Sequence, residues 1–298
     1  MTYRRGGPEA QSDLDFVRAA YRLLLMREPD DEGLNHHAER LADELATRSG
    51  IIRDLVTSAE FERLASIDEA VQLGLRAARE QRLLSDLRAP PRTDERLIEL
   101  PWVLSRYRGE SCVLDLGYAF AERAYLAALA HLGPQTLVGL DLAAGDPAGF
   151  LRVRGDIRGL PFPNGTFELV NCVSTVEHVG LDNSRYGQIR ESDFGGMLTG
   201  LSEIRRVLAP TGRLLLTLPC GAPEHHGWFA QRDVQGWVDL TRQSGFDTLE
   251  LEVFALESNG WRLLPANRTW RKLNNLSYGK RGPGASAVLC LSLTPAFS

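Results

Sequence analysis

The sequence predicts an α/β protein whose mostly parallel sheet carries an antiparallel edge hairpin and follows a small all-α bundle. Three observations support this prediction. Apolar, strand-like runs alternate with helix-forming stretches from Cys112 onward. Two neighbouring runs end in an acid, Asp115 and Asp141. The first 64 residues show helical periodicity instead.

Length and composition indicate a globular protein of two domains. The chain has 298 residues, of which 43% are hydrophobic and 24% charged. A net charge of −5 without a basic tract does not favour nucleic acid or anionic membranes as partners. No run is apolar for the ~18 residues of a membrane span, and the N-terminus lacks a signal peptide's apolar core. We therefore expect a cytoplasmic protein.

Residues 1–88 are predicted to form a helical domain and linker. Amphipathic helices begin at Ser12, Asp31 and Gly50, each after polar residues suited to capping. The string FVRAAYRLLLMREPDDEGLNHHAERL resembles a helical domain of unknown function related to phycobilisome-linker repeats. That domain often accompanies glycosyltransferases and methyltransferases of bacterial surface-polysaccharide assembly. The resemblance implies a docking or oligomerisation role, with a glycosyltransferase or a second copy as partner.

Residues 89–298 continue the alternation of strands and helices. The predicted helices are Asp94 to Tyr107, Glu122 to Leu132, Phe194 to Leu208 and Gln231 to Ser244. The predicted strands are Cys112 to Leu116, Thr136 to Leu140, Leu151 to Arg154, Phe167 to Val173, Gly212 to Leu218, Thr248 to Ala255 and Ala287 to Leu293. The last two strands follow each other closely, which predicts the antiparallel edge.

The two strand-terminal acids indicate a nucleoside site. In a βαβ unit the ligand lies at the carboxyl edge of the sheet, where Asp141 can accept hydrogen bonds from both ribose hydroxyls. A diphosphate-binding loop would have three glycines, whereas this loop has Gly117, Ala119 and Ala121. The ligand is therefore expected to be a nucleoside without phosphates. Asp115 could instead be a structural turn carboxylate, although a buried acid needs a partner.

Four segments in order, VLDLGYAFAE, VGLDL, VRGDIRGLPFPNGTFELVNCVSTVEHVG and LSEIRRVLAPTGRLLLTLP, resemble the motifs of class I S-adenosylmethionine (SAM)-dependent methyltransferases of the type-11 branch. The resemblance implies a Rossmann-like seven-stranded sheet, SAM as cofactor and S-adenosylhomocysteine (SAH) as product. It also implies cofactor contacts along the successive motifs, at Asp115, Gly117, Tyr118, Asp141, Leu142, Asp156, Ile157, Ser174 and Glu177.

Two of these assignments have structural alternatives. Asp156 could only cap the turn that follows it, because Asp is a common turn former. Tyr118 and Phe120 make the cofactor loop bulkier than its glycine-rich relatives. A catalytically silent methyltransferase fold that serves as an interaction subunit is therefore an alternative.

Methyl transfer to a hydroxyl needs a base, and histidine suits that role near neutral pH. His226 is the first candidate, with His225 and His178 next, because all three follow strands at the predicted carboxyl edge. Each could instead be a structural histidine. Acids and amides between Glu177 and Asp193 could hold Mg²⁺, but their irregular spacing favours a solvated acidic loop, and no metal ligand is assigned.

Aromatic and basic residues in the later loops are candidates for contact with a small-molecule or glycan acceptor. They are Tyr186, Arg190, Trp228, Trp261 and Trp270. A helix from Pro265 to Leu276 packed on the sheet would explain the segment around Trp270 equally well. Together with the enzymes that the N-terminal domain's relatives accompany, the methyltransferase resemblance implies O-methylation of a carbohydrate or glycosylated metabolite in a bacterial glycan or secondary-metabolite pathway. Methylation of a natural-product oxygen or nitrogen is the rival enzyme activity.

Overall fold

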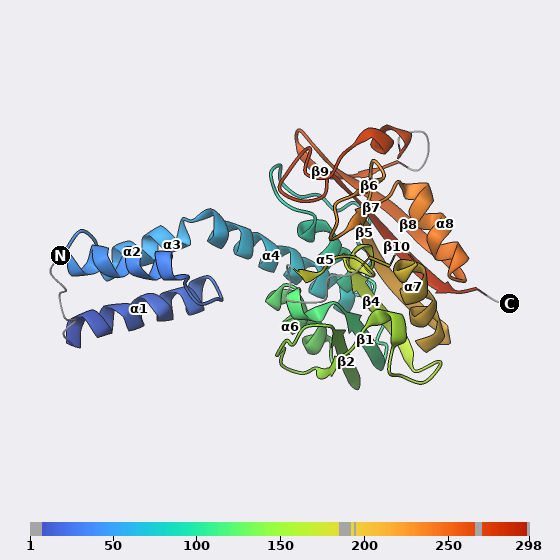
Figure 1. The fold of residues 1–298 in the computed structure, drawn as a ribbon, viewed down its shortest axis with the longest axis horizontal. Helices are drawn as coiled ribbons and strands as arrows, with labels where there is room; N and C mark the ends of the chain where they lie inside the picture. Colours follow the sequence, from blue (N-terminus) through green and yellow to red (C-terminus); the bar gives the residue numbers. More distant parts are fainter. Residues whose placement is uncertain (1–7, 185–191, 194, 266–269, 297–298) are drawn as a thin grey trace. The chain divides into compact units, whose positions relative to one another are not determined.

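The protein is described by a computed structural model over residues 8–184, 192–193, 195–265 and 270–296 (Figure 1). The chain forms two compact units, one ending at Asp68 and the other beginning at Glu69. Residues 69–88, which we expected to belong to the N-terminal part, lie in the second unit.

The first unit is helical. It contains α1 (Pro8–Leu24), α2 (Asp31–Ala42), α3 (Arg48–Val56) and the beginning of α4 (Ala59–Arg79). Two helix starts are capped by side chains: Asp30 accepts from the Gly33 amide at 2.6 Å, and Thr47 accepts from the Gly50 amide at 3.1 Å. Apolar side chains of α1, α2 and α3 form a separate small core.

The second unit is built on an eight-stranded sheet in the order β3-β2-β1-β4-β5-β10-β8-β9. The first five of these strands pair in parallel, and β10, β8 and β9 pair antiparallel. The strands are β1 (Cys112–Leu116), β2 (Thr136–Asp141), β3 (Leu151–Arg154), β4 (Phe167–Val173), β5 (Leu208–Pro219), β8 (Phe246–Glu257), β9 (Gly260–Leu264) and β10 (Ala287–Pro295).

The predicted fold class is confirmed, but the predicted count of seven strands was wrong. The additional strand is β9, which contains Trp261 and which we had predicted to be part of a loop. Only five residues long, it forms a hairpin with β8, with Glu257 paired to Gly260. Gly260 has a φ of 113°, which favours glycine at this tight turn.

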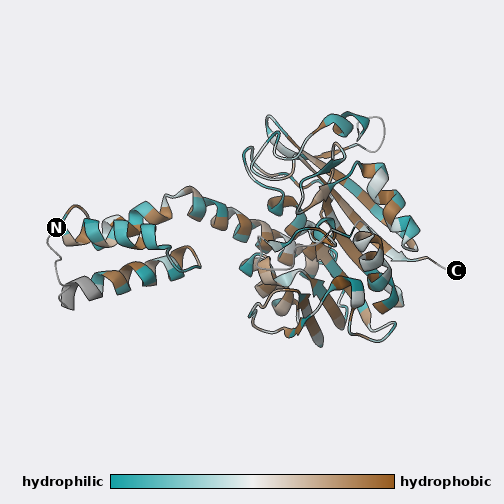
Figure 2. Cartoon of the chain, viewed as in Figure 1, coloured by the Kyte–Doolittle hydropathy of each residue, from teal (hydrophilic) through white to brown (hydrophobic). Residues whose placement is uncertain are grey.

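Helices cover both sides of the sheet. One side carries α5 (Arg96–Leu104) and α6 (Arg123–Leu132), which contact each other (Figure 1). The other side carries α7 (Gly196–Val207) and α8 (Val234–Gln243), which also contact each other. Figure 2 shows the apolar strands between these helices. Shorter elements are η1 (Tyr118–Phe120), η2 (Ile157–Gly159), η3 (Val176–His178), β6 (Glu224–His225), β7 (Ala230–Gln231) and η5 (Trp270–Asn275).

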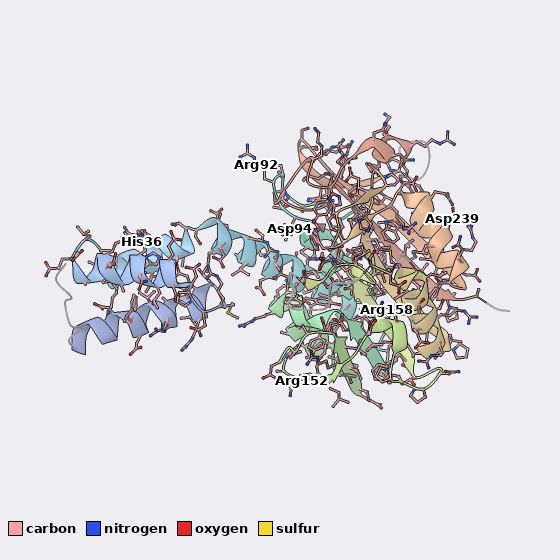
Figure 3. The ribbon with its side chains drawn as sticks, in the orientation of Figure 1. His36, Arg92, Asp94, Arg152, Arg158 and Asp239 are labelled. Atoms are coloured by element: carbon pink, nitrogen blue, oxygen red, sulfur yellow. The ribbon has the colours of Figure 1, made fainter. Side chains whose placement is uncertain are left out.

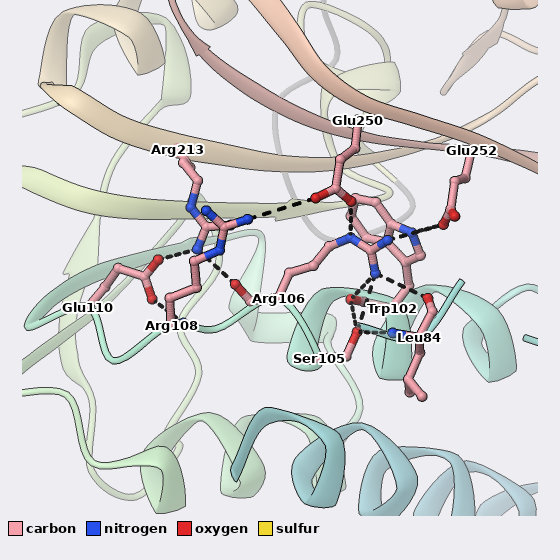
Figure 4. Close-up of polar contacts among 9 residues, drawn as sticks. All are labelled: Leu84, Trp102, Ser105, Arg106, Arg108, Glu110, Arg213, Glu250 and Glu252. Atoms are coloured by element: carbon pink, nitrogen blue, oxygen red, sulfur yellow. Dashed lines mark hydrogen bonds and ion pairs between the residues drawn. The ribbon is translucent and has the colours of Figure 1, made fainter. Parts of the chain in front are cut away.

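A buried arginine joins α5 to the antiparallel part of the sheet (Figure 4). Arg106, only 1% exposed, donates to Glu250 Oε2 at 2.8 Å and to Glu252 Oε2 at 3.1 Å on β8. Its guanidinium lies 3.8 Å from the ring of Trp102, whose indole donates to Glu252 at 2.6 Å. These contacts fix α5, which contributes to the cavity described below.

Within the part of the chain that the structure describes, no helix is both long enough and apolar enough to span a membrane.

Candidate functional site

A cavity of about 280 Å³ opens at the carboxyl ends of β1, β2 and β4. Its lining includes seven of the residues predicted from the motifs: Gly117, Asp141, Leu142, Asp156, Ile157, Ser174 and His178. The carboxyl edge is where the topology of an open parallel sheet places a ligand. Side chains that are far apart in the sequence are thus brought to one concave site.

Asp141, at the end of β2, presents its carboxylate to the cavity. One oxygen accepts from the Ala119 amide at 3.0 Å and the other from the Ala143 amide at 2.9 Å. Because each carboxylate oxygen can accept more than one hydrogen bond, both can still accept from a ligand. Burial raises the pKa of Asp141, and the backbone amides counteract that rise. The fixed carboxylate fits the two neighbouring hydroxyls of a ribose.

The loop after β1 approaches the end of β4 closely at Gly117. This glycine has a φ of 84°, and a Cβ there would clash with the hydroxyl of Thr175. A side chain is therefore excluded at this point for two separate reasons. The backbone of the β1 loop can consequently lie against a ligand in the cavity.

The bulky Tyr118 does not occupy the cavity. Its ring is 3% exposed, stacks with Phe150 at a centroid distance of 6.3 Å and lies over Gly139. A Cβ at Gly139 would come within 2.8 Å of this ring, as would one at Gly145. Two glycines thus make room for the tyrosine, while Phe120, which is 59% exposed, lies in the cavity lining. Tyr118, for which the resemblance implied a cofactor contact, therefore does not line the cavity, because its ring packs in the interior.

Asp115 lies beneath the cavity and is 3% exposed. It accepts a hydrogen bond of 2.8 Å from the phenol of Tyr125, which does line the cavity. Burial raises the pKa of Asp115 to about 7, although the Tyr125 hydrogen bond opposes this shift. Asp115, for which the resemblance implied a cofactor contact, does not itself line the cavity, whereas its hydrogen-bond partner Tyr125 does.

Asp156 both caps a turn and lines the cavity, so the two interpretations of this residue are compatible. Its carboxylate accepts from the Arg158 amide at 2.8 Å and from the Arg158 guanidinium at 2.5 Å. Burial alone would raise the pKa of Asp156, but the hydrogen bonds from Arg158 outweigh it and lower the pKa. Arg158, labelled in Figure 3, also pairs with Asp193 at 3.1 Å.

The residues after β4 are held in a strained conformation. Ser174 has a φ of 42°, which non-glycine residues rarely adopt, and its amide donates to the Thr217 carbonyl at 3.0 Å. Its hydroxyl donates to Glu99 on α5 at 2.7 Å. Glu177 is 2% exposed and does not line the cavity. Burial raises the pKa of Glu177 to about 8, and the nearby Glu99 adds to the rise.

The three candidate histidines occupy different environments. His178 lines the cavity, and its Nδ1 lies 2.8 Å from the Trp228 carbonyl oxygen. His226 stacks on Phe229 at 4.4 Å and pairs with Glu224 at 3.0 Å, outside the cavity lining. His225 is exposed and accepts from the Gly227 amide at 3.2 Å. Of the three, the geometry favours His178, which we had placed behind His226.

The predicted acceptor-binding residues are dispersed. Trp228 stacks on His178 with ring centroids 5.0 Å apart, which brings it to the edge of the site. Trp261 is 2% exposed in β9 and donates to the Thr93 carbonyl at 3.0 Å, so it packs in the interior. Trp270 begins η5 and packs against the main core. Tyr186 and Arg190 lie outside the described residues.

Sequence reasoning missed the contribution of α5. Arg96 and Leu100 line the cavity, and Glu99 binds the hydroxyl of Ser174. A polar pair in an otherwise apolar helix, Arg96 with Glu99, was the available signal. Among the described residues, no three His, Cys, Asp or Glu side chains are grouped so that they could hold a metal ion.

Two protein families match the chain. Residues 7–65 match a domain of unknown function, DUF4214, and residues 114–216 match a methyltransferase domain. The second range contains the β1 loop, Asp141, Asp156 and His178, and thus most of the cavity. No curated protein matches the chain.

Several solved structures match the chain at low sequence identity. One is 1,6-didemethyltoxoflavin-N1-methyltransferase of Burkholderia thailandensis with bound 1,6-didemethyltoxoflavin and SAH, at 13% identity and a TM-score of 0.45, covering 100% of this chain and 94% of that one. Another is a putative methyltransferase in complex with the Trm112 activator of Haloferax volcanii, at 18% identity and a TM-score of 0.42, covering 64% and 84%. A third is a SAM-dependent methyltransferase of Mesorhizobium loti, at 17% identity and a TM-score of 0.40, covering 62% and 91%.

Proposed function

We propose that this chain, which is a class I SAM-dependent methyltransferase, methylates a hydroxyl group of a carbohydrate or glycosylated metabolite. The observation that carries the choice of a hydroxyl is the position of His178 on the cavity wall. A hydroxyl acceptor needs a base to take its proton, whereas many nitrogen acceptors do not.

The residues that line the cavity would hold SAM. Asp141 would bind the ribose hydroxyls, the segment at Asp156 and Ile157 would border the adenine, and the Gly117 loop would lie by the methionine part. When bound, SAM supplies a methyl group that its sulfonium has already activated. The protein's task is therefore to align the acceptor and to remove its proton.

One hydrogen bond of His178 supports this role. A carbonyl oxygen can only accept, so the 2.8 Å contact between Nδ1 and the Trp228 carbonyl places the proton of the neutral ring on Nδ1. The lone pair is then on Nε2. Because His178 lines the cavity, Nε2 is the nitrogen that would take the proton of an acceptor hydroxyl.

A carbohydrate acceptor has two supports. Trp228 provides an aromatic face beside His178, and such faces suit the apolar side of a sugar ring. The N-terminal domain resembles one that accompanies enzymes of surface-polysaccharide assembly, and we propose that it docks the enzyme to such a partner or to a second copy.

The variant His178→Gln tests the proposed base. Methyl transfer from SAM to a panel of monosaccharides and glycosides should be about 10² to 10⁴ times slower than in the native enzyme, because no group removes the proton. SAH affinity, measured by calorimetry, should be unchanged. The control is His226→Gln, whose residue lies outside the cavity lining and whose rate should stay near native.

Three results would contradict the proposal in different ways. A native rate of methyl transfer in His178→Gln would exclude His178 as the catalytic base. Transfer to phenols or amines but to no sugar would favour the natural-product alternative. A folded protein that binds neither SAM nor SAH would favour the silent interaction subunit.

A further inference from the structure

Two arginines line the cavity in the part of the chain that the structure describes, and they differ in their partners. Arg158 is shared between two carboxylates, because its guanidinium binds Asp156 at 2.5 Å and Asp193 at 3.1 Å. Arg96, the first residue of α5, binds only one carboxylate. Among the described residues, Glu99 alone accepts a hydrogen bond from its guanidinium. Arg96 is therefore the cavity arginine with unused capacity for an anion.

The unused donors of Arg96 are available to a ligand in the cavity. A guanidinium carries N–H groups on Nε, Nη1 and Nη2, and Glu99 binds through Nη1 only. The side chain of Arg96 is 28% exposed, whereas that of Glu99 is 0% exposed. Because Arg96 lines the cavity and Glu99 does not, a ligand there meets the cation of this pair rather than the anion.

The position of the guanidinium is fixed from the sheet. Glu99 binds Arg96 with one carboxylate oxygen and accepts from the hydroxyl of Ser174 at 2.7 Å with the other. Ser174 directly follows β4, and its amide donates to the Thr217 carbonyl of β5 at 3.0 Å. Glu99 thus ties Arg96 to the carboxyl end of β4. A guanidinium held in this way loses little freedom when it binds a ligand.

The buried acids near Arg96 keep it charged. Burial would lower the pKa of Arg96, but Glu99, Glu95 and Glu177 together raise it above its ordinary value. Burial raises the pKa of Glu177 to about 8, so this carboxyl is mostly neutral at pH 7. Glu95 accepts from the Ala285 amide at 2.9 Å, and neither it nor Glu177 lines the cavity. A ligand in the cavity is therefore in closer contact with the charge of Arg96 than with these acids.

Arg96 and Asp141 lie on opposite sides of β1. In the sheet β1 lies between β2, which ends at Asp141, and β4, to whose end Arg96 is tied. Neighbouring strands are about 5 Å apart, so the ends of β2 and β4 are roughly 10 Å apart. The close approach at Gly117, in the loop after β1, lies between them. A ligand whose ribose binds Asp141 would therefore extend past Gly117 toward Arg96.

We propose that Arg96 binds the carboxylate at the amino-acid end of SAM through the donors that Glu99 leaves unused. A planar guanidinium matches a carboxylate in shape, and hydrogen bonds between them are charge-assisted. Arg96 lies before residues 114–216, so it is a cofactor-binding residue outside the range that matches the methyltransferase domain. The inference rests on the proposed function, because it takes the cavity as the SAM site. An acidic sugar acceptor carries the same group, and the experiment below separates the two sources.

Calorimetry with two matched ligands tests the proposal. SAH and its decarboxylated analogue, 5′-(3-aminopropylthio)-5′-deoxyadenosine, differ only in the carboxylate. The native protein should bind SAH about tenfold more tightly or better, as a charge-assisted hydrogen bond would give. Arg96→Met should abolish this preference by weakening the binding of SAH alone. The control Arg123→Met removes an exposed arginine beside Glu122 of the cavity lining and should keep the preference.

A second variant guards against loss of folding. Arg96→Met leaves the buried Glu99 without its cation, which can destabilise the protein. The double variant Arg96→Met/Glu99→Gln removes both charges and should show the same loss of preference for SAH. Circular dichroism shows whether each variant is folded. The comparison of the two ligands in the native protein needs no variant.

Several results would overturn the proposal. Equal affinities of the native protein for SAH and its analogue would do so, as would a preference for SAH that persists in the folded variants without Arg96. Equal affinities together with a preference of the SAH-saturated protein for glucuronate over glucose, lost in Arg96→Met, would assign the guanidinium to an acidic acceptor instead. If the folded native protein binds neither SAH nor its analogue, the cavity is not the SAM site, and the proposed function itself fails.

Discussion

Asp115 is the residue whose protonation should affect stability at the site. Its pKa in the folded protein is about 7, raised by burial from an ordinary value near 3.8. The folded state therefore holds this proton more tightly than the unfolded state does. The resulting stabilisation is complete below about pH 4 and is lost as the pH rises through 7.

The variant Asp115→Asn should remove this dependence. Its amide keeps an oxygen that can accept the Tyr125 hydroxyl but cannot ionise. Urea unfolding at pH 5 and pH 8 should show that the native protein loses more free energy of unfolding over this interval than the variant does. Equal losses would mean that Asp115 does not ionise in this range in the folded state.

Single residues of the cofactor site could be predicted where strand order alone fixes them. Asp141 ends a parallel strand, so its place at the ligand edge follows from the βαβ pattern. Tyr118 could not be placed, because its direction depends on room left by Gly139 in another strand and Gly145 in a later loop. The choice among the three histidines likewise depends on how the β5–α8 loop folds back, which no local pattern shows.

Among the secondary-structure elements, α5 links the core to the site. It presents Arg96 and Leu100 to the cavity, while the following Arg106 is bound to Glu250 and Glu252 of β8. The sequence showed an apolar helix, but not that a later antiparallel strand would supply its ionic partners. In the same way, β9 was not predicted as a strand, because its pairing comes from the hairpin that it forms with β8.

The variant Arg106→Met tests the link between α5 and β8. Removing one partner of a buried ion pair leaves the other charges uncompensated, so the free energy of unfolding should fall by about 3–5 kcal/mol. Urea unfolding provides the measurement. The control Arg242→Met breaks an exposed pair with Asp239, at 70% and 47% exposure, and should change stability by less than about 1 kcal/mol. Equal losses in both variants would contradict a structural role for Arg106.

At the scale of the whole molecule, the described cavity is built entirely from the unit that begins at Glu69. The N-terminal helical unit has its own small core. This division agrees with a catalytic unit joined to a docking unit, and the docking role remains our proposal. Binding of the cofactor should accordingly depend on residues of the second unit.

Calorimetric titration of SAH into the full chain and its Asp141→Ala variant tests most directly whether SAM binds in this cavity. We predict one-to-one binding by the native protein and an affinity at least about tenfold weaker in the variant, because two charge-assisted hydrogen bonds to the ribose are lost. Circular dichroism should show that both proteins are folded. Equal affinities, or no binding by the folded native protein, would contradict the account.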